Sequence, residues 1–243
     1  MENKPLNKNK LDGKQVWRYE RKIPIINYDK KQLEFLIRRN FYSFVPHYPD
    51  RYIYNIYYDS NNFQYFHENQ EGLSNRKKIR LRWYNNNQKI HNSKLEIKSK
   101  KGMVGSKQVF HLPDFNMLIS SKNLVNTNRK LLEADSLPNW VKEMSMFLQP
   151  TLFNSYKRQY YISKDKLFRI TLDTQLTFQD PLEKYNVSKL LLPSNLMVLE
   201  IKYLAENDQK ASEIMNSFPF RVDKFSKYVF GLNKIRIKNY ATI

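Results

Sequence analysis

The chain has 243 residues, of which 41% are hydrophobic, which is enough for one domain with a sizeable core and too much for a disordered chain. Its 42 Lys and Arg outnumber its 23 Asp and Glu, and the formal net charge of +19 favours an anionic partner: nucleic acid, polyphosphate, a nucleotide or a membrane surface. The absence of cysteine excludes disulfides, cysteine-based zinc sites and thiol nucleophiles. The sequence shows no signal peptide and no run of about 18 apolar residues. Together with the absence of cysteine, these features lead us to expect a soluble, cytoplasmic protein.

The expected elements follow a polar, Lys- and Asn-rich stretch. Residues 1–14 are expected to be a flexible basic tail, and residues 15–243 a single domain. Asp29 and Gln32 have the spacing of a helix capping box. The expected strands span residues 15–25, 51–60, 77–84, 94–100, 107–112, 156–163, 167–174 and 196–204. The expected helices span residues 29–41, 62–70, 114–148 in two pieces, 205–218 and 223–232.

Four of the expected strands alternate charged and apolar residues. Successive side chains of a strand point to opposite faces, so residues 78–84 present cations on one face and apolar residues on the other. Lysines that only interact with solvent would explain the lysine-rich loops. They do not explain why Glu20, Glu96 and Glu200 occupy the same alternating strand positions as the cations. We therefore expect these faces to converge in a barrel that holds a polyanion and its metal ion.

The histidines, one glycine-containing segment and the aromatic residues are interpreted as structural and not as functional features. The four histidines are scattered, and none has the H-E-x-x-H spacing of a zinc site. GMVGSK at 102–107 has the wrong spacing for a phosphate loop and leads into a strand, so it is expected to be a hairpin turn. The 17 tyrosines and 15 phenylalanines could stack on single-stranded nucleic acid, but most alternate with charged positions as core residues do. No nucleic-acid partner is expected.

A series of motifs resembles the vacuolar transporter chaperone (VTC) domain in the right order, from about residue 17 to about residue 232. The motifs are RYERK (18–22), YYDS (57–60), KIRLRWY (78–84), LEIKSK (95–100), SYKRQYY (155–161), FRITLD (168–173), LEIKY (199–203) and FPFRVDKFSKYVFG (218–231). The resemblance implies an α+β fold of the CYTH-like triphosphate tunnel metalloenzymes, with a closed antiparallel eight-stranded barrel and flanking helices. It also implies a polyphosphate polymerase that moves the γ-phosphate of ATP onto a growing polyphosphate chain with Mn²⁺ or Mg²⁺.

The resemblance assigns roles to individual residues. It implies catalytic, phosphate-clamping cations at Arg80, Arg82, Lys98, Arg158 and Arg169. It implies further substrate contacts at Lys22, Tyr156, Lys224, Ser226 and Lys227. Glu200 matches the metal-binding glutamate, and Glu20 and Glu96 are further candidates that could be metal ligands or ion-pair partners. Arg18 stands where the wider superfamily has the first glutamate of E-x-E-x-K, which fits the VTC branch and argues against a simple triphosphate hydrolase.

Two other functions are also compatible with the sequence. A triphosphatase of the same fold would use water as the acceptor, and a non-catalytic module would only bind polyphosphate or inositol phosphates. A carboxylate retained among the cations argues against a pure anion binder, which gains nothing from it. The expected partners are ATP, polyphosphate and pyrophosphate, and a membrane-protein partner that receives the product is compatible with the sequence.

Overall fold

A computed structural model describes the protein over residues 10–11, 14–15, 18–84, 89–101, 104–112, 117–118, 126–181 and 195–241. The expected turn at 85–88 and part of the expected helical region 114–148 lie outside these residues. The chain divides into two compact units. Unit 1 comprises Met1–Pro49, Gln159–Leu172 and Val198–Lys224. Unit 2 comprises Asp50–Arg158, Asp173–Met197 and Phe225–Ile243.

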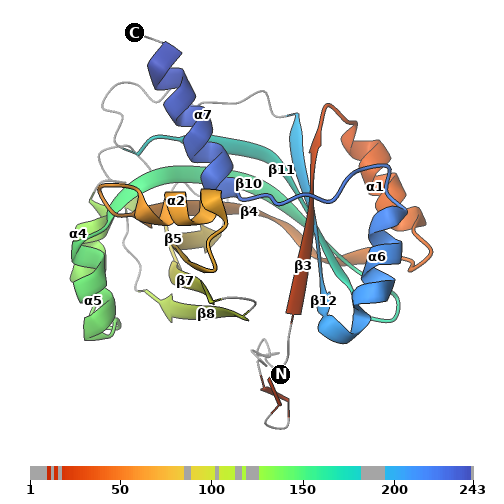
Figure 1. The fold of residues 1–243 in the computed structure, drawn as a ribbon, viewed down its shortest axis with the longest axis horizontal. Coiled ribbons are helices and arrows are strands. Elements are labelled where there is room, and N and C mark those ends of the chain that lie inside the picture. Colours follow the sequence, from red (N-terminus) through yellow and green to blue (C-terminus); the bar gives the residue numbers. More distant parts are fainter. Residues whose placement is uncertain are drawn as a thin grey trace. The chain divides into compact units, whose positions relative to one another are not determined.

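Strands and helices agree with most of the expected elements (Figure 1). The strands are β1 Lys10–Leu11, β2 Lys14–Gln15, β3 Arg18–Ile26, β4 Val45–Asp59, β5 Asn75–Tyr84, β6 Lys89–Ile90, β7 Lys94–Lys101, β8 Val104–His111, β9 Met117–Leu118, β10 Gln149–Ile162, β11 Arg169–Gln179 and β12 Leu196–Leu204. The helices are α1 Lys30–Arg39, α2 Gln64–Glu71, α4 Thr127–Leu132, α5 Asn139–Met146, α6 Asp208–Asn216 and α7 Lys227–Ala241, with a 3-10 turn at Ala205–Asn207. No helix of the described residues is both long enough and apolar enough to span a membrane.

The main sheet has eight strands in the order β3-β12-β11-β10-β4-β5-β7-β8. An eight-stranded antiparallel sheet with flanking helices was expected, and this part of the prediction is confirmed. Closure into a barrel is not observed. A barrel requires its first and last strands to pair, and among the described residues β3 and β8 remain unpaired with each other at the two edges of the sheet.

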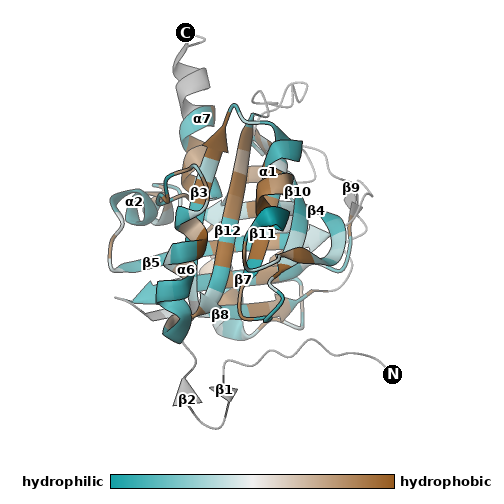
Figure 2. Cartoon of the chain, turned by 90° about the vertical axis from the view of Figure 1, so that its right-hand side faces the viewer, coloured by the Kyte–Doolittle hydropathy of each residue, from teal (hydrophilic) through white to brown (hydrophobic). Residues whose placement is uncertain are grey.

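Unit 1 contains α1, β3 and α6, together with parts of the long strands. The capping interaction expected for α1 is present, because the Asp29 carboxylate accepts the backbone N–H of Gln32 at 2.8 Å. Leu33 and Ile37, on the apolar stripe of this helix, are fully buried. Figure 2 shows that β12 is mostly hydrophobic, as expected for a strand at the centre of a core.

Unit 2 confirms the alternation expected for residues 78–84. Ile79, Leu81 and Trp83 on β5 are at most 1% exposed, and they share a core with residues of α4 and α5 such as Leu131 and Val141. These two helices therefore cover the apolar face of the strands. The charged residues of the same strands lie on the opposite face.

Helix α7 packs closely on the sheet of unit 2 (Figure 1). A Cβ atom at Gly231 would lie 2.9 Å from the Leu152 side chain on β10 and would also overlap the ring of Phe178 on β11. Glycine allows α7 to approach the strands this closely, because any larger residue would force the helix or the Phe178 ring to move.

Candidate functional site

The charged face of β4, β5 and β7 brings arginines and a glutamate together in unit 2. Arg80 on β5 pairs in register with Tyr57 on β4 and with Glu96 on β7. Arg82 pairs in the same way with Asn55 on β4. Directly paired residues lie on one side of a sheet, so these side chains share the face opposite the core.

Glu96 lies at the centre of a group of cations. Its carboxylate accepts hydrogen bonds from Arg80 Nε at 2.7 Å and from Lys107 Nζ at 2.5 Å, and Arg82 Nη1 lies 3.7 Å away. The Glu96 side chain is only 3% exposed. Burial alone would raise the pKa of the Glu96 carboxyl, but the charges of Arg80, Arg82 and Lys107 lower it well below its usual value. The structure shows Glu96 in ion pairs with Arg80 and Lys107, and its role as a metal ligand stays a prediction.

A second group of charges surrounds Asp173, which is fully buried. Arg158 donates to both carboxylate oxygens, from Nε at 2.5 Å and from Nη2 at 2.7 Å, and Lys227 Nζ donates to Oδ2 at 2.5 Å. Burial alone would raise the pKa of the Asp173 carboxyl, but the charges and hydrogen bonds of Arg158 and Lys227 lower it. Asp173 therefore stays ionised and fixes the direction of both cations.

Tyr156 joins the two groups of charges. Its hydroxyl accepts a hydrogen bond from Arg82 Nη2 at 3.1 Å, and Lys227 Nζ lies 4.7 Å from the centre of its ring. Burial alone would raise the pKa of the Tyr156 hydroxyl, but Arg82, Arg158 and Lys227 outweigh it and lower the pKa to about 8. A buried phenol whose acidity is increased in this way indicates a site that favours negative charge.

Lys227 is held in place by its neighbour Tyr228. The Tyr228 hydroxyl donates to Asp59 Oδ2 at 2.5 Å, and Asp59 also accepts the backbone N–H groups of Tyr65 and Phe66 at the start of α2, each at 2.8 Å. Asp59 is fully buried. The carboxylate therefore ties the start of α7 to the start of α2.

We expect Tyr228→Phe to destabilise the protein by about 1–3 kcal/mol, because it leaves a buried carboxylate oxygen without its hydroxyl donor. Urea denaturation checks this. Tyr19→Phe is the matched control, since Tyr19 is 39% exposed and should unfold as the wild type does. Equal midpoints for Tyr228→Phe and wild type would show that water replaces the hydroxyl at Asp59.

In unit 1, Glu20 and Glu200 lie near one lysine. Lys202 Nζ is 3.0 Å from Glu200 and 3.8 Å from Glu20, and Lys22 Nζ is 3.7 Å from Glu20. The Glu200 side chain is 7% exposed and the Glu20 side chain 35%. No group of three or more His, Cys, Asp or Glu residues able to hold a metal occurs in the described part of the chain. A metal here would have two carboxylates from the protein and would need further ligands from substrate and water.

The structure thus distributes the expected site residues over both units. In unit 2 it brings together Arg80, Arg82, Glu96, Tyr156, Arg158 and Lys227. Lys98 lies in register with Lys78, on the side of β7 that also carries Glu96. Ser226 precedes α7, and its hydroxyl accepts the N–H of Val229 at 3.4 Å, as a helix cap does. In unit 1, Glu20, Lys22 and Glu200 lie near Lys202, whereas Arg169 and Lys224 are exposed.

Sequence reasoning missed three charged residues of these groups: Lys107, Asp173 and Lys202. Asp173 and Lys202 lie in the motifs FRITLD and LEIKY, in phase with other charged residues of their strands, and this phase was an available signal. Lys107 had no such signal, because its contact with Glu96 depends on the register between β7 and β8.

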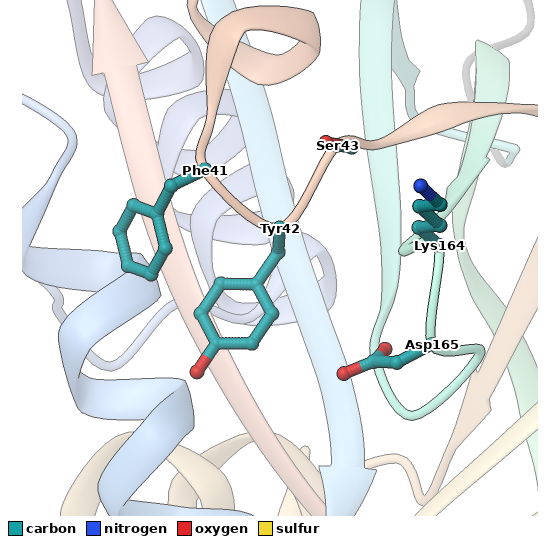
Figure 3. A pocket seen from close by; sticks show the side chains of 5 residues that line it. All are labelled: Phe41, Tyr42, Ser43, Lys164 and Asp165. Carbon is teal, nitrogen blue, oxygen red and sulfur yellow. The ribbon is translucent and has the colours of Figure 1, made fainter.

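A shallow pocket of about 280 Å³ in unit 1 contains none of the expected site residues. It is lined by Phe41, Tyr42, Ser43, Lys164 and Asp165. Figure 3 shows the Asp165 side chain extending toward Tyr42. One lysine and one aspartate give this pocket no excess of positive charge, so it does not suit a polyanion.

The chain matches the sequence model of one protein family. The family model described as the VTC domain matches residues 13–236. No curated protein sequence matches the chain.

Three solved structures are among those similar to this chain. The PH1819 protein of Pyrococcus horikoshii has 14% identity and a TM-score of 0.47, covering 90% of this chain and 98% of its own. A candidate adenylate cyclase from Vibrio parahaemolyticus has 10% identity and a TM-score of 0.48, covering 86% and 95%. A Hippeastrum protein described as a candidate adenylyl cyclase with a dominant triphosphatase activity has 13% identity and a TM-score of 0.47, covering 86% and 93%.

Proposed function

Because this chain belongs to the VTC domain family, we propose that it is a metal-dependent polyphosphate polymerase that transfers the γ-phosphate of ATP to a growing polyphosphate chain. The observation that carries the proposal is the connected set of cations in unit 2, in which Arg80, Arg82, Arg158 and Lys227 are oriented by the buried Glu96 and Asp173. Tyr156 links the two halves of this set.

The arrangement suits phosphoryl transfer. This reaction needs alignment of the reacting oxygens and neutralisation of charge on the transferring group, and it needs little covalent help from the protein. Arginine presents two parallel donors to phosphate oxygens, and lysine adds a point charge. Carboxylates that fix these cations in advance reduce the reorganisation needed when substrate binds. The attacking group would be a terminal phosphate oxygen of the acceptor, so no activated serine or cysteine is required.

The remaining expected residues supply further phosphate contacts in this proposal. Lys98 in unit 2, and Lys22, Arg169 and Lys224 in unit 1, are proposed as further phosphate-binding residues. Pyrophosphate and polyphosphate are the proposed acceptors, and a supply of ATP favours a cytoplasmic location.

Glu200, with Glu20, would hold the divalent metal. Both carboxylates already lie within 4 Å of the Lys202 ammonium, so the site favours a cation. Oxygen ligands are those that Mg²⁺ and Mn²⁺ prefer, and phosphate oxygens and water can complete the set. A bound metal supplies charge neutralisation on the phosphates. Glu96 is assigned the ion-pair role in the proposal, because three cations, Arg80, Arg82 and Lys107, surround its carboxylate.

One assay separates the candidate functions. Purified protein is incubated with ATP and Mn²⁺ or Mg²⁺, and the products are separated on a gel that resolves polyphosphate. The polymerase should form long polymer beside unreacted ATP. Orthophosphate alone would identify the triphosphatase, which the same cations would serve with water as the acceptor. Absence of any turnover, with retained polyphosphate affinity, would identify a binding module.

A further inference from the structure

Two buried amide side chains support Arg82 from the neighbouring strands of unit 2. Asn154, Asn55 and Arg82 lie on β10, β4 and β5, which are adjacent in the main sheet. Arg82 Nε donates to Asn55 Oδ1 at 2.8 Å, and Asn55 Nδ2 donates to Asn154 Oδ1 at 2.9 Å. Both asparagines are fully buried. The Arg82 guanidinium is therefore held by side chains that have no contact with solvent.

Arg82 determines which way both amides point. A guanidinium has only donors, so the Asn55 atom beside Nε is its oxygen, and the Asn55 NH2 group is directed at Asn154. Asn154 accepts with its oxygen, and its own NH2 group is buried without an acceptor among the described residues. A buried donor without an acceptor destabilises a folded protein. The chain therefore holds Arg82 with two amides at a cost in stability.

Arg82 differs from the neighbouring arginines in the charge of the group that its Nε contacts. Arg80 Nε donates to the Glu96 carboxylate at 2.7 Å, and Arg158 donates to both oxygens of Asp173. Arg82 Nε donates to a neutral amide, and its Nη1 lies 3.7 Å from the Glu96 carboxylate. A carboxylate in direct contact offsets much of the charge of a cation. An amide oxygen fixes the direction of the guanidinium and leaves its net charge unchanged.

We propose that Asn55 is a positioning residue for phosphoryl transfer, which fixes the direction of Arg82 without offsetting its charge, and that Asn154 fixes the orientation of Asn55. Arg82 Nη2 also donates to the Tyr156 hydroxyl at 3.1 Å. A guanidinium has more N–H donors than these contacts use, so donors of Arg82 remain for a phosphate oxygen. The role of Asn55 rests on the proposed function.

Exchange of the amide for a carboxylate separates the direction of Arg82 from its charge. Asn55→Asp has nearly the same shape and keeps an oxygen beside Arg82 Nε. Burial of a carboxylate costs free energy, but Arg82 and the NH2 group of Asn154, once this amide has turned, offset that cost. We expect Asn55→Asp to be at least as stable as wild type in urea. We expect its affinity for tripolyphosphate, measured by calorimetry, to fall by about tenfold or more, because the new charge offsets that of Arg82.

Two further variants complete the test. Asn61→Asp places the same charge at an exposed residue of unit 2, and it should bind tripolyphosphate as wild type does. Asn55→Leu adds no charge but leaves Arg82 Nε without its acceptor. It should unfold at lower urea concentration than wild type. It should also lower kcat for ATP by about tenfold or more with a smaller change in KM, because alignment in the transition state is lost.

Wild-type affinity in Asn55→Asp would overturn the proposal. Equal losses of affinity in Asn55→Asp and Asn61→Asp would overturn it as well, because they would indicate diffuse surface attraction. If Asn55→Asp and Asn55→Leu lost stability and affinity to the same extent, the role of Asn55 would be structural only, which also contradicts the proposal.

A second measurement covers the case in which Asn55→Asp does not fold. Asn154→Ala leaves Arg82 and Asn55 in place but allows the Asn55 amide to turn its NH2 group toward Arg82. It should weaken tripolyphosphate binding by about threefold or more, and unchanged affinity would overturn the proposal. Release of orthophosphate alone in the ATP assay would remove the polymerase, and the tripolyphosphate affinities would still decide whether Asn55 positions Arg82.

Discussion

Arg158→Ala is expected to destabilise the protein by about 3–5 kcal/mol, because it removes the bidentate partner of a carboxylate that has no access to solvent. Of the cations that the structure describes, Lys227 alone would remain within ion-pair distance of Asp173. Where the variant still folds, ATP turnover should fall at least tenfold, since the arginine is also an oriented phosphate donor. Urea denaturation and the polymer assay at low temperature measure the two effects.

Two comparisons make the Arg158 result specific. Arg129→Ala removes an exposed arginine from an ion pair with Glu133, and it should change neither stability nor turnover measurably. Adding Asp173→Asn to Arg158→Ala should recover part of the lost stability, because it removes the buried charge that the single variant leaves poorly paired. Wild-type stability in Arg158→Ala would mean that water reaches Asp173.

Glu200→Gln is expected to abolish turnover while polyphosphate binding stays intact or becomes slightly stronger. The substitution removes the more buried of the two carboxylates proposed to hold the metal, and it also removes a negative charge that repels phosphate. Turnover is measured over a range of Mn²⁺ and Mg²⁺ concentrations, and polyphosphate affinity by anisotropy. Glu206→Gln changes an exposed glutamate of unit 1 and serves as the control. A Glu200→Gln variant as active as wild type would refute the metal assignment.

Alternation along single strands was the strongest signal in the sequence. It separated Ile79, Leu81 and Trp83 from Arg80 and Arg82, and the structure places the first three in the core and the arginines on the opposite face. This works because a strand imposes a period of two on any residue pattern. Strand positions were therefore predictable without knowledge of their partners.

Pairing between distant residues was not predictable in the same way. The contact between Lys227 and Asp173 joins residues 54 apart, and that between Tyr228 and Asp59 joins residues 169 apart. Periodicity contains no information on such pairs, because they depend on how helices and strands pack. For the same reason the sequence left two roles open for Glu96, and the register of β5, β7 and β8 shows its ion pairs. The prediction of a closed barrel was wrong for a similar reason, because closure depends on pairing between the two edge strands β3 and β8.

The close packing of Gly231 also determines where Lys227 lies. The two residues are four apart in α7, so they lie on the same face of the helix, about one turn from each other. Contact with Leu152 and Phe178 fixes both the depth and the rotation of that face. A single residue inserted between positions 227 and 231 would rotate Lys227 by about 100° away from Asp173. The glycine thus fixes the direction in which the Lys227 side chain points, one turn away along the same helix.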